Sequence, residues 1–375
     1  MNNTQRAGDY SNQQQFEAEV QYITQNNNYI IDGEEASDYF VKIFTENFPK
    51  LHADAMQLAI KCAEEMTLMV LAEICGVDPS HISNLRRPSA QAALLAAQES
   101  YAQTGDPNTG AGDIPLARML ARLVAKAVIG QTRTLEEIVF QRAIRTAPLL
   151  THQQLNSLSV LAIFGSFTFN GENPAEVISN LDNFYSPYYG QIVTGDLEYS
   201  YMESTGAGKS ELILPPGVYA RIRKIHRAAM RNSFYMSEVP ANVTAQHRAE
   251  YLESDPHNEM LCRVRADKIA ELLDARQDVV AMASAVLSGG DSLIELREFV
   301  EQRMYSEGEL KEQIEREAPN LFKFLELLDR TGAIYFRPST IGLILADQEL
   351  GLRFPGSNLL GPMVSLDSAS HDEAE

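Results

Sequence analysis

The chain has 375 residues, of which 45% are hydrophobic, and it carries a formal net charge of −20 at pH 7. This hydrophobic content is typical of a globular protein and excludes wholesale disorder. The acidic balance disfavours non-specific nucleic-acid binding by the molecule as a whole, because phosphates and carboxylates repel one another. The three cysteines, Cys62, Cys75 and Cys262, are far apart and odd in number, which indicates neither a disulfide framework nor a zinc knuckle.

The amino-terminal residues predict no targeting signal. Residues 1–15 are polar and contain no apolar segment of the kind that a signal peptide carries. No stretch reaches the roughly 18 uninterrupted apolar residues that a membrane span needs. We therefore predict a protein of the reducing cytoplasm that does not contact a membrane.

Residues 1–30 are rich in Asn and Gln and predict a flexible leader, and residues 31–170 predict an N-terminal helical domain. Within this domain, apolar residues recur at the steps that one face of a helix requires. A first run comprises Phe40, Ile43, Phe44 and Phe48, and a second comprises Ala59, Cys62, Met66, Met69 and Val70. The second run predicts that Cys62 is a core residue rather than a reactive one.

The stretch 89–167 carries the clearest helix signals. Ser89 and Asp113 are predicted to cap two helices, because a short polar side chain can accept a hydrogen bond from a free helical N–H group. The sequences at 134–137 and 151–154 both fit the capping box. Residues 158–164 are nearly apolar all round, which predicts a buried central helix.

Residues 171–354 predict a C-terminal helical domain, and residues 355–375 a flexible tail. Leu197, Tyr199 and Tyr201 alternate with polar residues, which predicts a strand and a small β-hairpin insertion near 195–214. Pro215 and Pro216 are predicted to begin a helix. Residues 334–336 are predicted to form a short strand, which precedes a last helix at 339–350. The predicted fold class is therefore mainly α, a multi-helix bundle or stack of helices with one hairpin.

Several of these segments together resemble a known family. They are "ESYAQTGD" (99–106), "RAIRTAPLLTHQQLNSLSVL" (142–161), "DLEYSYMESTGAGKS" (196–210) and "STIGLILA" (339–346). The chain resembles an uncharacterised family of mostly helical bacterial proteins known only by locus names. The resemblance implies a bacterial cytosolic setting, and it transfers no activity and no functional residue.

The turn at 203–210 contains Gly206, Gly208, Lys209 and Ser210, a partial match to the phosphate-binding loop. Glu203 stands where that loop needs its first glycine, and a carboxylate there would repel a phosphate. A phosphate loop also opens directly into a helix, whereas here a Pro-Pro pair follows. Two interpretations stay open, a hairpin loop in which glycine supplies positive φ and an anion or nucleotide site.

An acid-free window at 212–237 carries the densest positive charge in the chain. Arg221, Lys224 and Arg231 share one face of its predicted helix, and Arg223 and Arg227 lie between them. Seven tyrosines lie between 185 and 235, and cations interleaved with aromatics suit a nucleotide or single-stranded nucleic acid. Alternatively, the cations pair with the protein's own carboxylates or with a partner subunit, while the tyrosines fill the edge of a core.

No other motif indicates chemistry. His247 and Glu250 belong to a cluster of histidines and carboxylates, but the Asp255-Pro256 break favours a solvated helix end over a metal site. No nucleophile elbow and no Cys/His signature is present. We expect no metal and no cofactor.

The most direct functional prediction is association rather than catalysis. The many amphipathic helices favour a protein that binds a second copy of itself or a protein partner, in a setting such as a defence or stress module. The alternative is a nucleotide- or nucleic-acid-binding effector that uses residues 205–231.

Overall fold

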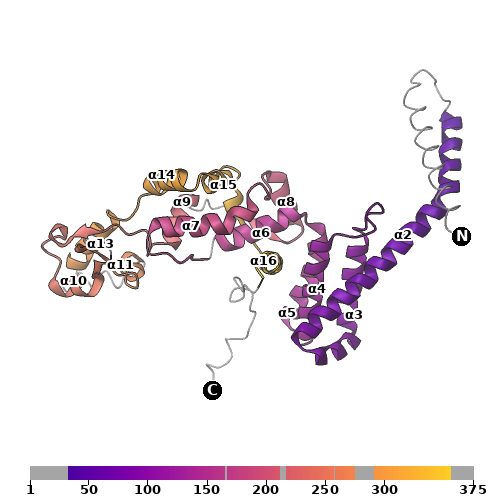
Figure 1. Cartoon of the computed structure of the whole chain (residues 1–375), viewed down its shortest axis with the longest axis horizontal. Coiled ribbons are helices and arrows are strands. Elements are labelled where there is room, and N and C mark those ends of the chain that lie inside the picture. The colour runs from indigo at the N-terminus through magenta and orange to yellow at the C-terminus, as the bar shows by residue number, and fades with distance from the viewer. Residues whose placement is uncertain (1–32, 165–166, 212–216, 257, 275–290, 356–375) are drawn as a thin grey trace.

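The computed structural model describes residues 33–164, 167–211, 217–256, 258–274 and 291–355, with side chains from residue 52 onward. The predicted leader, nearly all of the predicted tail and the Pro215-Pro216 pair lie outside these residues. The chain is mainly α-helical, as predicted. Its elements form three groups along an elongated molecule (Figure 1). The domain boundaries predicted from sequence stay a prediction.

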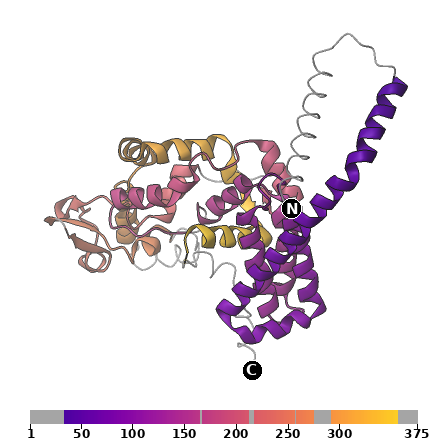
Figure 2. The same cartoon turned by 45° about the vertical axis from the view of Figure 1, so that its right-hand side comes forward.

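The first group is a bundle around one very long helix. It contains α2 (Gly33–Val77), α3 (Pro88–Ala102), α4 (Ile114–Ile129) and α5 (Leu135–Thr146). Cys62, Met66, Val70 and Ile74 recur every fourth residue of α2 and are fully buried against α3 and α4. This confirms that Cys62 is a core residue. The amino-terminal part of α2 extends well beyond the helices that pack on it (Figure 2).

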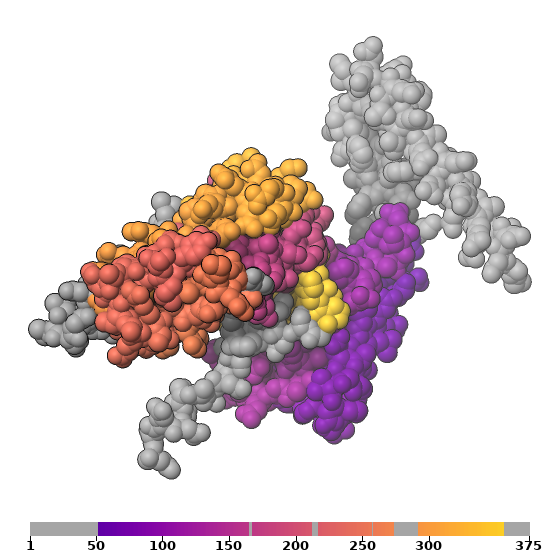
Figure 3. Space-filling model, turned by 60° about the vertical axis from the view of Figure 1, so that its left-hand side comes forward, coloured from indigo at the N-terminus to yellow at the C-terminus, as the bar shows by residue number. Residues whose placement is uncertain are grey.

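The central group is built around α6 (His152–Phe164), which is buried from Gln154 to its end. This confirms the predicted central helix. The other central helices are α7 (Pro174–Tyr185), α8 (Asp196–Ser204), α9 (Val218–Ile225), α14 (Glu307–Glu317), α15 (Pro319–Arg330) and α16 (Thr340–Arg353). The last helix, α16, packs against α6, α5 and α4, so the carboxyl-terminal helix joins the first two groups. In Figure 3 it lies between the N-terminal bundle and the remaining helices.

The third group holds a small antiparallel sheet. It contains α10 (Ala245–Tyr251), α11 (Ile269–Asp274) and α13 (Asp291–Glu301). The sheet has the strand order β2-β4-β3, with β2 (Phe234–Tyr235), β3 (Leu252–Asp255) and β4 (Asn258–Val264). The sequence did not predict this sheet.

Among the predicted helix caps, two are confirmed and two are corrected. Asp113 accepts a hydrogen bond from the backbone N–H of Leu116. Thr151 and Gln154 form a complete capping box, with both side chains accepting from the other residue's backbone N–H. The predicted cap at Ser89 is wrong, because Pro88 already occupies the first helical turn and Arg87 is the N-cap. In the box at 134–137, the Glu137 carboxylate accepts from the backbone of Arg133 rather than that of Thr134.

The hairpin predicted near 195–214 is wrong. Residues 196–204 form the helix α8, with Tyr199 and Met202 buried at helical spacing and Leu197 at 86% exposure. The following strand, β1 (Gly208–Ser210), pairs with β5 (Phe336–Pro338) in antiparallel register. The turn at 203–210 therefore joins a helix to a strand whose partner is more than a hundred residues away.

Candidate functional site

The glycine turn closes the carboxyl end of α8. Gly206 has φ +82°, a conformation that an L-residue with a side chain rarely adopts. Its N–H donates to the Glu203 carbonyl at 2.9 Å, and the N–H of Ala207 donates to the Met202 carbonyl at 3.0 Å. These two hydrogen bonds form the Schellman motif, which satisfies the last carbonyls of a helix. Gly206 is therefore a helix C-terminal glycine.

The same turn lies in close contact with the start of α16. Ser339 donates its hydroxyl to the Gly206 carbonyl at 2.6 Å and its backbone N–H to the Ala207 carbonyl at 3.0 Å. A Cβ added at Gly208 would lie 2.3 Å from the Phe336 ring, and one added at Gly342 would lie 1.9 Å from the Ala207 carbonyl oxygen. Both glycines are thus explained by close backbone packing.

This geometry favours a structural role for the turn over a phosphate cradle. A phosphate loop precedes a helix and offers it free N–H groups at the positive end of the helix dipole. Here the turn follows the carboxyl end of α8, where the dipole is negative. The N–H of Ser210 is directed at the Glu203 carboxylate, 3.3 Å away, and the exposed Lys209 lies opposite Arg337 across the strand pair. The anion-site interpretation stays a prediction without support from this arrangement.

The three basic residues predicted to share one face have different surroundings. Arg221 is half-buried and donates to the Ile334 carbonyl at 3.1 Å. Burial lowers the pKa of its guanidinium, and the nearby Glu211 carboxylate opposes this effect. Arg231 is 5% exposed, pairs with Glu253 at 3.5 Å, and donates to the carbonyls of Ala228 and Val264. For Arg231, the interpretation that the cations pair within the protein fits these contacts.

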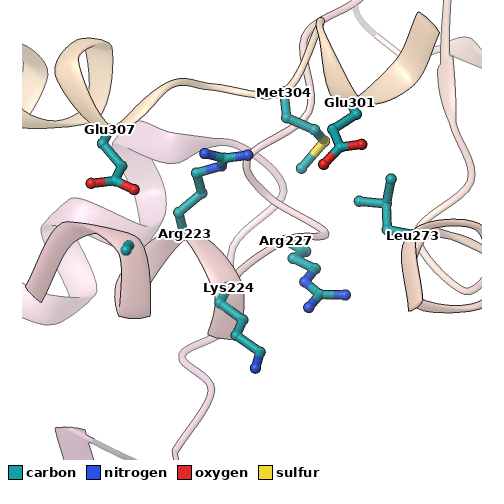
Figure 4. Close-up of a pocket in the computed structure, with 8 residues that line it drawn as sticks. Arg223, Lys224, Arg227, Leu273, Glu301, Met304 and Glu307 are labelled. Atoms are coloured by element: carbon teal, nitrogen blue, oxygen red, sulfur yellow. The ribbon is translucent and has the colours of Figure 1, made fainter. Parts of the chain in front are cut away.

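Lys224 is exposed, and it lines a cavity of about 280 Å³ between α9 and the third group (Figure 4). Arg223 and Arg227 line the same cavity from the end of α9 and the turn that follows. Two carboxylates face it, those of Glu301 at the end of α13 and Glu307 at the start of α14. Leu273 and Met304 supply apolar surface.

Most of the tyrosines near the basic window belong to the core. Tyr185 and Tyr188 are fully buried, and Tyr199 and Tyr219 are 6% and 7% exposed. The ring of Tyr185 lies within aromatic contact distance of Phe164, Phe169, Phe184 and Phe324. Burial raises the pKa of both Tyr185 and Tyr188. These rings are therefore unavailable for stacking on a base.

The histidine and carboxylate cluster does not converge on a metal site in the described part of the chain. His247 Nδ1 lies 2.9 Å from the Ser292 hydroxyl, and Glu250 lies 3.9 Å from the Lys268 ammonium. His257 lies outside the described residues. Among the residues that the structure describes, no group of three or more histidines, cysteines or carboxylates is placed to hold a metal ion.

Sequence reasoning missed the acidic side of the cavity. Glu301 and Glu307 are about 80 residues from the basic window in sequence and belong to ordinary charged helices. Only their positions in the fold bring them opposite Arg223, so no local pattern indicated them.

The comparisons with known proteins identify the family. The model of an uncharacterised family named by a locus tag matches residues 31–359, and the chain belongs to this family. The resemblance inferred from the sequence is thereby confirmed. No curated protein and no solved structure matches the chain. Among the described residues, no helix is both long and apolar enough to cross a membrane.

Proposed function

We propose that this family member acts in the bacterial cytoplasm by self-association, and that two copies meet along the solvent-facing side of α2. One observation carries the proposal. Met56, Ile60 and Leu68 on α2 are 58%, 52% and 66% exposed. Apolar side chains left in water at this density along one helix favour burial against a partner surface.

The exposed residues form a row opposite the core row. Ile60 is two residues from the buried Cys62, and Leu68 is two residues from both Met66 and Val70, which are also buried. A step of two residues corresponds to about 200° around a helix. Exposed apolar side chains therefore lie on the side of α2 opposite its core row, with the exposed Glu64 between Ile60 and Leu68. The core row is covered by α3 and α4, whereas the described residues leave more than half of each side chain in the other row exposed.

The length of α2 supports a contact between copies. Its 45 residues span about 68 Å at 1.5 Å per residue, while α3 and α4, with 15 and 16 residues, support only part of it. Most helical stability in water comes from tertiary packing. A second α2, related by a two-fold axis, would pack against the extending part, and each copy would cover the exposed row of the other with one self-complementary surface.

Light scattering after size-exclusion chromatography tests the proposal on the full chain. We expect the wild type to show twice the chain mass. The double variant Ile60→Gln, Leu68→Gln should show the mass of one chain, with an unchanged helical circular dichroism spectrum. Leu197→Gln is the matched control, because Leu197 is 86% exposed on α8, away from this row, and its loss should leave the mass unchanged.

Salt concentration distinguishes an apolar contact from one made by ion pairs. The net charge of −20 makes two copies repel one another at low ionic strength. Salt weakens this repulsion, because the screening length is only about 10 Å at 0.1 M. The affinity of an apolar dimer should therefore stay constant or increase as the salt concentration rises from roughly 50 to roughly 500 mM. A wild type that is monomeric throughout, or a dimer that survives the double substitution, would contradict the proposal.

A further inference from the structure

The cavity below α13 and α14 is lined by charges of both signs. In Figure 4 the carboxylates of Glu301 and Glu307 lie on the upper side of the view, and the charged groups of Lys224 and Arg227 lie on the lower side. Arg223 reaches between the two carboxylates. The cavity therefore offers both a cationic and an anionic group to a ligand.

The charged groups of Arg223 and Lys224 make no ion pair or hydrogen bond with the described residues. In the part of the chain that the structure describes, neither group has an ion-pair partner within 4.0 Å or a hydrogen-bond acceptor, in contrast to Arg221 and Arg231. Glu301 and Glu307 are equally without a cationic partner among the described residues. Opposite charges thus line one cavity without closing it by pairing.

Both signs of charge limit the ligands that fit. A simple anion would be attracted by the basic side and repelled by two carboxylates, and a simple cation would meet the reverse. The volume of about 280 Å³ lies just below the range of roughly 300–1,000 Å³ that is usual for drug-sized ligands. A ligand that carries both charges on a short apolar body satisfies all three features.

We propose that this cavity binds a small zwitterion, an α-amino acid or a dipeptide. Its carboxylate lies at Lys224 and the guanidinium of Arg223, which can bind a carboxylate through two N–H groups. Its ammonium lies at Glu301, on the same side of the cavity as Leu273 and Met304, against which its side chain packs. This site is independent of the contact proposed for α2.

Calorimetric titration of the full-length protein tests the proposal with two probes, leucine and alanyl-leucine. One or both should bind, which distinguishes a free amino acid from a peptide. Each probe has two blocked forms, one N-acetylated and one with an amidated carboxyl group. Both blocked forms should bind roughly ten- to a hundredfold more weakly, the usual effect of losing a charged hydrogen bond.

Single substitutions locate the site. Lys224→Gln and Glu301→Gln should each weaken binding of the better probe by a similar factor of roughly ten to a hundred. Lys323→Gln is the matched control, because Lys323 is exposed on α15 and does not line the cavity. The proposal is overturned if neither probe binds, if the blocked forms bind equally well, or if inorganic phosphate binds and Glu301→Gln tightens its binding.

Discussion

His226 should make the stability of this protein fall between neutral and mildly acidic pH. The residue follows α9 and is only 4% exposed, and among the described residues its Nδ1 has no hydrogen-bond partner. Its ring lies 6.0 Å from that of Phe169. Burial lowers the pKa of the imidazole to about 4, and a hydrogen bond with the backbone of Phe169 offsets only part of this effect.

The magnitude follows from the difference in pKa between the two states. In the unfolded chain the pKa is about 6.5. Between pH 6.5 and pH 4 the imidazole is therefore protonated in the unfolded state and neutral in the native state. Stability therefore increases with pH across this window and is lost as the pH falls. At about 1.36 kcal/mol per pKa unit, the full loss approaches ~3 kcal/mol, of which about 2 kcal/mol appears between pH 7.5 and pH 5.

The assay is urea unfolding of the wild type and of His226→Gln at pH 7.5, 6 and 5. Glutamine keeps a polar side chain but does not titrate, and all carboxylates are common to both proteins. The wild type should lose about 2 kcal/mol more than the variant between pH 7.5 and 5, whatever their absolute stabilities. Equal losses in the two proteins would refute the argument that His226 stays neutral in the fold.

The remaining predictions concern the glycine turn and the basic residues. Gly342→Ala should cost roughly 1–3 kcal/mol or more by thermal unfolding, because the new methyl group meets the Ala207 carbonyl. Gly76→Ala, where nothing lies within 4 Å, should be neutral or slightly stabilising, and a similar loss in both variants would contradict the proposed packing. Arg231→Ala should cost roughly 1–3 kcal/mol because buried carbonyls lose their donor, whereas Lys224→Ala should stay within about 0.5 kcal/mol. Lys209→Ala should also stay within about 0.5 kcal/mol, and a loss of function at unchanged stability would restore the phosphate interpretation.

The helices were predictable where their signals are local. Asp113 and the Thr151–Gln154 pair act through residues within three positions, so the sequence contains the whole interaction. The burial of α6 follows from its own composition. The prediction that Ser89 caps α3 was wrong for an equally local reason. Pro88 fits the first turn of a helix, so the N-cap is Arg87, two residues before Ser89.

The strand at 197–201 failed because two periodicities overlap in a short segment. Alternation placed Leu197, Tyr199 and Tyr201 on one side of a strand, but only Tyr199 among them is buried. The segment packs through Tyr199 and Met202, which are one helical turn apart. Gly208 could not be interpreted locally either, because Phe336, whose ring leaves no room for a Cβ at this position, comes more than a hundred residues later.

The basic residues show most clearly what a sequence pattern leaves undetermined. Arg221, Lys224 and Arg231 follow one another on a single predicted face, so periodicity treats them alike. The fold directs Arg221 to the Ile334 carbonyl and Arg231 to Glu253 and Val264, each of them a group from a distant segment. Lys224 and its neighbour Arg223 line a cavity, and among the described residues neither they nor the carboxylates of Glu301 and Glu307 have an ion-pair partner. A binding site in this window is therefore defined by the charges that have no partner within the fold, and the zwitterion titration with Lys224→Gln and Glu301→Gln tests that difference directly.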